Sequence, residues 1–323
     1  MRHIPLDAVL DAAQHVYRAA VRTPLVRLDL PFESAGRGPE VYLKLESLQP
    51  IGSFKIRGAW NAVRKLSPDV MKDGVWTVSA GNAAQGVAFA ARLAGVPCSV
   101  MVMDTAPAAK LRAIEKLGAA IVKASYDECW KTVESHASTR MRGHFVHPFD
   151  DDDFIAGNAT VGLEILEDLP DVDAVVAALG GGGLLSGVAS VIRTRQPGVR
   201  IFAAEPETAA PLSRSLAAGH ACYFDGWKPS FVDGAGGKSV LETMWPLLKE
   251  LVDGSIVVSL DDVAAAMRRA AERVHIVAEG AGATAIAAAL SGRAGTGKIV
   301  AVVSGGNIDL SRFAELVGAS QHV

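Results

Sequence analysis

The strongest constraint on the fold is a repeated switch between short apolar runs and longer segments whose apolar residues recur at helical spacing. One block predicts, in chain order, strand 75–79, helix 84–94, strand 98–103, helix 108–117, strand 119–123, helix 126–141 and strand 144–147. Such alternation, with strands that are apolar almost throughout, is typical of a parallel sheet covered by helices on both faces. The predicted fold class is therefore α/β.

The same alternation continues on both sides of this block. Before it, a strand is predicted over 41–45 and a helix over 54–66, with Ser53 as the helix cap. The later part predicts a helix over 155–168, strands over 174–179, 199–204, 256–259 and 299–303, helices beginning at Leu184, at Asp261 and near residue 282, and an irregular stretch over 206–246.

Length predicts two lobes. The chain has 323 residues, which is more than one hydrophobic core usually holds. We expect residues 1–70 and 150–323 to form a large domain, and residues 71–149 to form a small domain inserted in it. Parallel sheets bind ligands beyond the carboxyl ends of their strands, so a cleft between the two lobes is the expected site.

Charge and cysteine content argue against several classes of protein. The formal net charge is -3, so no basic surplus is available for a nucleic-acid backbone. The cysteines are far apart, without a CxxC pair, which argues against a disulfide framework or a zinc site; they are Cys98, Cys129 and Cys222. The first residues lack an apolar signal core, and the longest apolar runs are too short to cross a membrane. We expect a cytoplasmic enzyme without a membrane partner.

Lys55 is the first candidate for chemistry. It follows Ser53 and Phe54 at the start of a predicted helix. The positive end of a helix dipole disfavours a cation there. Together with burial, this field would lower the lysine pKa, as a lysine that forms a Schiff base requires. By position alone, an exposed lysine in a capped first turn is the favoured alternative.

Four consecutive glycines form the second candidate. Gly180, Gly181, Gly182 and Gly183 lie between an apolar strand and a helix, where backbone N–H groups can bind a phosphate. A tight turn needs only one glycine. The dinucleotide fingerprint is not matched, but Glu205 follows at the distance of a ribose-binding acid, so a nucleotide-dependent oxidoreductase stays an alternative. A P-loop ending at Gly237-Lys238-Ser239 is disfavoured, because Val232 stands at its first glycine.

Three weaker candidates complete the set. Small residues in the loop Ser79-Ala80-Gly81-Asn82-Ala83 can expose backbone donors to a carboxylate, although capping alone would explain them. Ser304, after the last strand, could present its hydroxyl to a ring nitrogen, and again a turn is the simpler explanation. His147 is expected to be structural, and the acidic run 150–153 is expected to be a solvated turn.

Taken together, these segments resemble the fold-type II pyridoxal-phosphate enzymes, in particular the threonine/serine dehydratase and serine racemase branch. The resemblance spans nearly the whole chain, and the order of the motifs makes it specific. The matching segments are Leu43 to Glu46, Gly52 to Ala59, Ser79 to Asn82, Gln85 to Ala88, Ala106-Pro107 with Lys110, His147 to Asp150, Ile155 to Gly157, Gly162 to Ile165, Gly180 to Leu184 and Ser304 to Asn307.

The resemblance implies a two-lobed fold like that of the tryptophan synthase β-subunit, with pyridoxal 5′-phosphate (PLP) held by the large domain. The implied roles are Lys55 as the catalytic lysine that carries the cofactor, Phe54 against its ring, Asn82 at the ring hydroxyl, Gly180, Gly181, Gly182, Gly183 and Leu184 around the phosphate, Ser304 at the ring nitrogen, and Ser79, Ala80, Gly81, Asn82 and Ala83 around the substrate carboxylate. The family precedent also implies a homodimer.

The implied reaction is β-elimination from a β-hydroxy-amino acid of the threonine or serine type, giving a 2-keto acid and ammonia. Ala80 stands where the family usually has serine, so poor racemisation is expected. Ala83 replaces the usual histidine, and Asn158-Ala159 replaces Gln-Gly. These departures keep open a larger substrate (phenylserine, hydroxyectoine-pathway or hydroxyaspartate type). A serine racemase and a non-catalytic ligand sensor are further alternatives. No metal is expected, because Pro211 stands where a second acid near Glu205 would lie.

Overall fold

Two sheets dominate the structure, a computed structural model that describes residues 2–29 and 38–318. The larger sheet has the strand order β1-β2-β10-β7-β8-β9. Only β1 runs antiparallel to its neighbour. Its strands are β1 (Leu25–Arg27), β2 (Glu40–Lys44), β7 (Ala174–Ala178), β8 (Arg200–Pro206), β9 (Gly254–Val258) and β10 (Lys298–Val302).

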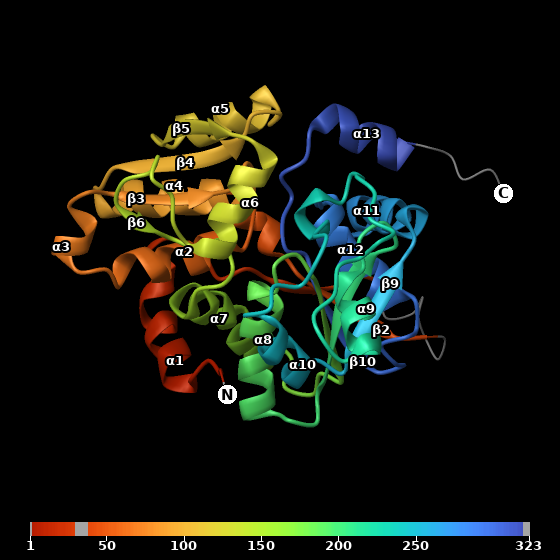
Figure 1. Ribbon diagram of the computed structural model, residues 1–323. Coiled ribbons are helices and arrows are strands. Elements are labelled where there is room, and N and C mark those ends of the chain that lie inside the picture. Colours follow the sequence, from red (N-terminus) through yellow and green to blue (C-terminus); the bar gives the residue numbers. More distant parts are fainter. Residues whose placement is uncertain (1, 30–37, 319–323) are drawn as a thin grey trace.

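The smaller sheet is built from one continuous stretch of chain and is entirely parallel. Its order is β5-β4-β3-β6, and it lies in the upper left of Figure 1. The strands are β3 (Val75–Val78), β4 (Cys98–Met103), β5 (Ala120–Ala124) and β6 (His144–Phe145), and the helices that follow the first three are α4 (Asn82–Ala94), α5 (Ala108–Lys116) and α6 (Tyr126–Ser135). The predicted α/β class, with parallel sheets and helical cover, is confirmed.

Helices cover the larger sheet on both faces because its central strand β7 is apolar and buried in every position. Val175 and Ala177 pack into the core formed with α7 (Asp152–Asp168) and α8 (Gly183–Arg195). The alternate residues of the same strand face the opposite core, which contains α11 (Leu260–Val274) and α12 (Gly280–Leu290). Because successive side chains of a strand point to opposite faces of the sheet, β7 contributes to two separate cores.

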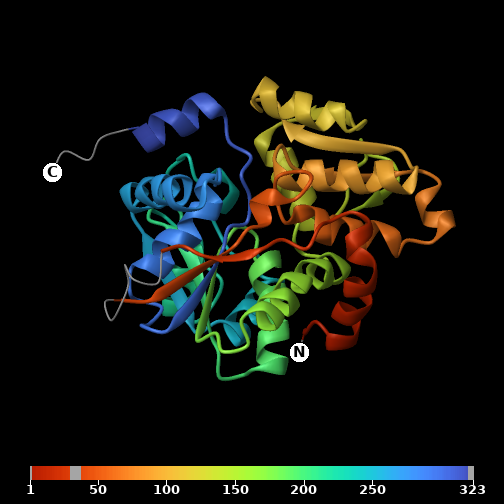
Figure 2. The ribbon, with the colours of Figure 1, turned by 180° about the vertical axis from the view of Figure 1, so that it is seen from behind.

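Helix α2 (Lys55–Arg64) connects the two halves of the molecule, as the view from behind in Figure 2 also shows. It packs on α4 and on α7. The approach to α7 requires glycine, because a Cβ on Gly58 would lie 2.3 Å from the Phe154 ring and one on Gly157 would lie 2.5 Å from the Arg57 carbonyl. Close packing on two helices fixes the direction in which each α2 side chain points.

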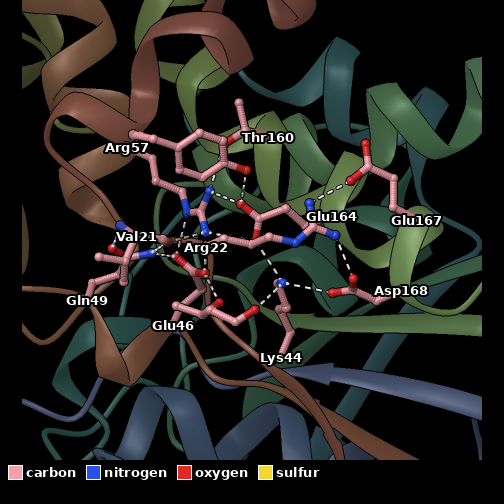
Figure 3. A network of polar contacts seen from close by, with 12 residues as sticks. Val21, Arg22, Lys44, Glu46, Gln49, Arg57, Thr160, Glu164, Glu167 and Asp168 are labelled. Atoms are coloured by element: carbon pink, nitrogen blue, oxygen red, sulfur yellow. Dashed lines mark hydrogen bonds and ion pairs between the residues drawn. The ribbon is translucent and has the colours of Figure 1, made fainter.

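A buried ion cluster anchors one side of α2 (Figure 3). Arg57 is fully buried. Its Nε lies 2.7 Å from Glu46 Oε2, and its Nη1 lies 2.6 Å from Glu164 Oε1. Lys44 Nζ lies 2.7 Å from the other oxygen of Glu164. The cluster thereby joins β2, the 3-10 helix Glu46–Leu48, α2 and α7.

The structure corrects several predicted boundaries. Ser53 does not cap α2: its hydroxyl is buried without a hydrogen-bond partner, and the helix begins at Lys55. The helix predicted over 126–141 ends at Ser135, because His136 adopts left-handed backbone angles (φ 56°). The stretch 206–246 was predicted to be irregular, yet it contains α9 (Pro211–Ala218).

Further elements were not predicted from the sequence. They are α1 (Leu6–His15), α3 (Pro68–Met71), α10 (Trp245–Leu251), α13 (Leu310–Gly318) and the 3-10 helices Val16–Arg18 and Asp233–Ala235. Within the ranges described, none of the helices combines the length and the apolar character needed to cross a bilayer.

Candidate active site

One cavity of about 560 Å³ collects the residues that the sequence singled out. It lies where β3, β7 and β10 end, at the loops that follow these strands. Every predicted cofactor or substrate residue lines it, namely Phe54, Lys55, Ser79, Ala80, Gly81, Asn82, Ala83, Gly180, Gly181, Gly182, Gly183, Leu184 and Ser304. The fold therefore brings together segments that are up to 250 positions apart in the chain (54 to 304).

Lys55 points into this cavity and has no carboxylate partner among the described residues. Its Nζ donates a hydrogen bond to the carbonyl of Pro148, and it lies 5.2 Å from the centres of the Phe54 and Phe154 rings. The side chain is only partly exposed, and burial lowers the pKa of its amine to about 7. The alternative of an ordinary exposed lysine is wrong.

The glycine loop connects β7 to α8 against the wall formed by Phe149. A Cβ on Gly181 would lie 2.1 Å from the Phe149 ring, and Gly182 has left-handed backbone angles (φ 94°) directly before α8. The first N–H groups of α8 have no helical partner. This backbone cup at a helix N-terminus suits a phosphate.

Glu205 does not reach the cavity, which removes the main support for nucleotide binding. It is fully buried. Its carboxylate accepts hydrogen bonds from the backbone N–H groups of Leu212 and Ser213, each at 2.8 Å, and one from the Ser255 hydroxyl. Burial raises the pKa of this carboxyl group. Glu205 therefore holds the start of α9 and is unavailable to a ribose.

The Ser79–Ala83 segment forms another part of the cavity wall. The Ser79 hydroxyl accepts a hydrogen bond from the Gly81 N–H, and Asn82 begins α4. Asn82 Nδ2 donates to Glu279 Oε1 at 2.7 Å, and Asn82 Oδ1 accepts from Asn307 Nδ2 at 2.7 Å. The α4 N-terminus offers backbone donors to a small carboxylate.

Several cavity residues were missed by sequence reasoning. Glu279 is buried; burial and the nearby charge of Asp233 raise the pKa of its carboxyl group to about 7. Lys110, which was quoted as part of a family motif but given no role, pairs with Asp233 at the rim. Lys238 was considered only as part of a P-loop, and its Nζ lies 4.4 Å from the Tyr126 ring centre. A single charged residue carries no periodic signal that would have revealed its role.

The acidic run 150–153 is not the solvated turn that was expected. Asp150 is 7% exposed and binds Arg2 and the Thr243 hydroxyl. Its backbone N–H and that of Phe149 both donate to His147 Nδ1, while His147 Nε2 lies 3.2 Å from a backbone carbonyl. Burial lowers the pKa of His147 to about 3. Because both ring nitrogens are engaged within the chain, His147 has a structural role.

Comparison with known proteins identifies the family. Residues 16–305 match the family model described as pyridoxal-phosphate dependent enzyme. The chain is 39% identical over 317 residues to an L-threonine ammonia-lyase of Thermotoga maritima (97% of this chain, 78% of that protein). It is 34% identical over 327 residues to a serine racemase of Dictyostelium discoideum (98% and 99%).

A solved structure agrees with these relatives. The fold superposes on maize serine racemase with a TM-score of 0.87 at 32% identity, covering 97% of each chain. The lysine of lowered pKa, the glycine cup and the neutral Ser304 fit the aldehyde, phosphate and ring of PLP. The chain therefore belongs to the pyridoxal-phosphate dependent enzymes of fold type II.

Proposed function

We propose that the protein is a PLP-dependent ammonia-lyase that eliminates water from a β-hydroxy-amino acid of the threonine or serine type. The products are a 2-keto acid and ammonia. The observation that carries this proposal is Lys55, a lysine with a pKa lowered to about 7 inside a cavity that ends in a glycine cup. Relatives named L-threonine ammonia-lyase and L-threonine dehydratase support the reaction class.

In this proposal, the chain holds the cofactor at both ends. Lys55 would bind its aldehyde covalently, and Gly180 to Leu184 would bind its phosphate through backbone N–H groups. Phe54 packs against the ring, and Asn82 faces the ring hydroxyl. When bound, PLP supplies an electron sink for the charge that develops at the substrate α-carbon.

The chain's own groups then move the proton and hold the substrate. The freed amine of Lys55 takes the α-proton, which it can do near neutral pH because burial lowers its pKa. The Ser79–Ala83 loop and the α4 N-terminus hold the substrate carboxylate. Ser304 offers the ring nitrogen an uncharged hydroxyl, which favours prompt loss of the β-hydroxyl over a long-lived charge at the α-carbon.

Ala80 separates this chain from a racemase. Racemisation requires a second group that can return the proton on the side opposite to Lys55. The loop position that carries serine in the racemase branch is alanine here, and a methyl group cannot transfer a proton. The proposal is therefore elimination with little racemisation, although a serine racemase is among the similar proteins.

The substrate can be larger than threonine. The cavity wall includes the rings of Tyr126, Trp130 and Trp227, and Ala83 leaves space where the family usually has histidine. These rings favour a β-hydroxy-amino acid with an extended side chain, such as a phenylserine.

We also propose that residues 71–149 form a small domain inserted in the large one, since every strand of the smaller sheet lies within 75–145.

The test is an assay of purified protein with a panel of β-hydroxy-amino acids. The proposal predicts a yellow protein that releases keto acid and ammonia in equal amounts, and a colourless, inactive Lys55→Ala variant. A colourless wild type that binds a nicotinamide nucleotide would instead favour the oxidoreductase. Amino-acid binding that persists without turnover in both proteins would favour a sensor.

A further inference from the structure

A chain of three side chains crosses the cavity wall from one sheet to the other. Asn307 Nδ2 donates to the Ile51 carbonyl at 2.8 Å and to Asn82 Oδ1 at 2.7 Å. Asn82 Nδ2 in turn donates to Glu279 Oε1 at 2.7 Å. Asn82 starts the helix after β3, whereas Glu279 and Asn307 belong to loops of the larger sheet. The Asn82 amide, on the side of the smaller sheet, is thus held by Glu279 and Asn307, on the side of the larger sheet.

Glu279 occupies the position directly before α12, yet it does not cap that helix. A side chain at this position normally accepts hydrogen bonds from the first N–H groups of its own helix, and no such bond is made. The carboxylate instead turns to Asn82. The turn demands space, because a Cβ on Gly305 would lie 2.5 Å from Glu279 Oε1 and 3.2 Å from Asn82 Nδ2.

The partners fix which way the Asn82 amide points. Both N–H groups of Asn307 are used as donors, so the Asn82 atom facing it must be the oxygen. If the amide were flipped, its oxygen would face the Glu279 carboxylate, and two acceptors would meet without a proton between them. The second N–H of Asn82 Nδ2 is then left for a ligand in the cavity.

We propose that Glu279 is a positioning residue for the cofactor: it locks the Asn82 amide in the orientation that presents an N–H to the PLP ring hydroxyl. The inference rests on the proposed function, because it takes from it the place of Asn82 beside that hydroxyl. In this role Glu279, which also lines the cavity, acts through Asn82.

The lock depends on the ionisation state of Glu279. Its pKa is raised to about 7 by burial and then by the charge of Asp233, while the Asn82 hydrogen bond, the Lys110 charge and the Asn307 N–H oppose the shift. Above this pKa the carboxylate only accepts, so one amide orientation is allowed. Below it the protonated group can also donate, so Glu279 no longer disfavours the flipped amide and only Asn307 opposes it.

The experiment compares Glu279→Gln, Glu279→Ala, Asn82→Ala and the double variant Glu279→Ala/Asn82→Ala as holoenzymes. The readouts are the visible absorption band of the resting enzyme between pH 6 and 8.5 and the dissociation constant of PLP. We expect a pH-dependent band in the wild type with a midpoint near 7, and its loss in Glu279→Gln. Each alanine variant should weaken PLP binding by about tenfold.

Because Glu279 acts through Asn82, the double variant should bind PLP no more weakly than Asn82→Ala alone. Glu205→Gln is the matched control: this carboxyl group is also buried with a raised pKa but lies away from the cavity, so the band and its pH dependence should not change. Multiplying effects in the double variant, or an unaltered pH transition in Glu279→Gln, would overturn the inference while leaving the proposed function intact. A wild type without a visible band would overturn both.

Discussion

Lys55 and Arg57 are two residues apart on α2, and the chain treats these two buried cations in opposite ways. Successive helical residues are about 100° apart, so the two side chains leave the helix on nearly opposite sides. Arg57 enters the ion cluster of Figure 3, whereas Lys55 enters the cavity. One stays charged and holds the fold together; the other loses its charge readily and is available for chemistry.

The difference lies in the partners, since both side chains are removed from water. Arg57 donates two hydrogen bonds to Glu46 and two to Glu164. Burial disfavours its charge, yet the two carboxylates raise its pKa. Lys55 has a carbonyl and two rings around it, so burial acts unopposed and lowers its pKa. For these two cations, the presence or absence of a neighbouring carboxylate determines whether the pKa is raised or lowered, and with it whether the side chain is structural or reactive.

The largest expected effect comes from removing the reactive cation. Lys55→Ala should lower keto-acid formation by at least about 10⁴-fold, because it removes both the cofactor link and the proton acceptor. Lys65→Ala, at the end of the same helix, removes partly exposed pairs with Asp153 and Asp11 and should retain activity. Substantial turnover by Lys55→Ala would contradict the assignment of Lys55 as the reactive cation.

Removing the structural cation, Arg57, should mainly lower stability. Arg57→Met leaves Glu46 and Glu164 buried without their main partner, and we expect the free energy of unfolding to fall by about 3–5 kcal/mol, measured by urea denaturation. Arg22→Met is the matched control at the exposed edge of the cluster, with an expected loss of at most about 1 kcal/mol. Equal losses for the two variants would show that burial of the cluster is not what matters.

The two cations should also differ in how they link stability to pH. The Lys55 amine binds its proton less tightly in the folded apoprotein than in the unfolded chain, so unfolding takes up a proton between pH 7 and 10.5. Stability should therefore rise with pH in this window, by at most about 1.4 kcal/mol per pH unit. Lys55→Met should remove the rise and stabilise the apoprotein at pH 7. A wild-type stability that falls with pH in this window, with no change in Lys55→Met, would contradict the assignment.

The smallest expected effect tests whether Lys55 is the group that transfers the α-proton without a second acid or base. Ala80→Ser introduces a hydroxyl into the cavity wall and should give detectable D-serine from L-serine, while elimination changes by less than about tenfold. Ala83→Ser, in the same loop, is the control and should not racemise. Brisk racemisation by the wild type would mean that another group returns the proton.

Sequence reasoning predicted most of the fold because the strands and helices here are strongly periodic. β4 was predicted with its observed bounds, and the helix end at Gly95 has the expected left-handed angles. The incorrect boundaries arise where local backbone geometry or packing differs from what the sequence pattern predicts. His136 ends α6 through its own backbone angles, and Ser53 is buried before α2, where packing replaces capping.

The candidate site divides in the same manner. Gly180–Gly183 and the Ser79–Ala83 loop were found because several unusual residues adjoin each other in the sequence. Glu279 and Asp233 were not, because each is a single acid whose importance depends on what the fold places beside it. Lys55 was found as a candidate, but its lowered pKa depends on the absence of a nearby carboxylate, which only the folded arrangement shows.

The most direct test of the account is to trap the cofactor on the chain. Borohydride reduction of the yellow holoenzyme, followed by proteolysis and mass spectrometry, should place the pyridoxyl group on the peptide that contains Lys55 and on no other. Three further lysines line the cavity, namely Lys110, Lys228 and Lys238. A label on any of these, or no label at all, would contradict the claim that Lys55 is the reactive lysine.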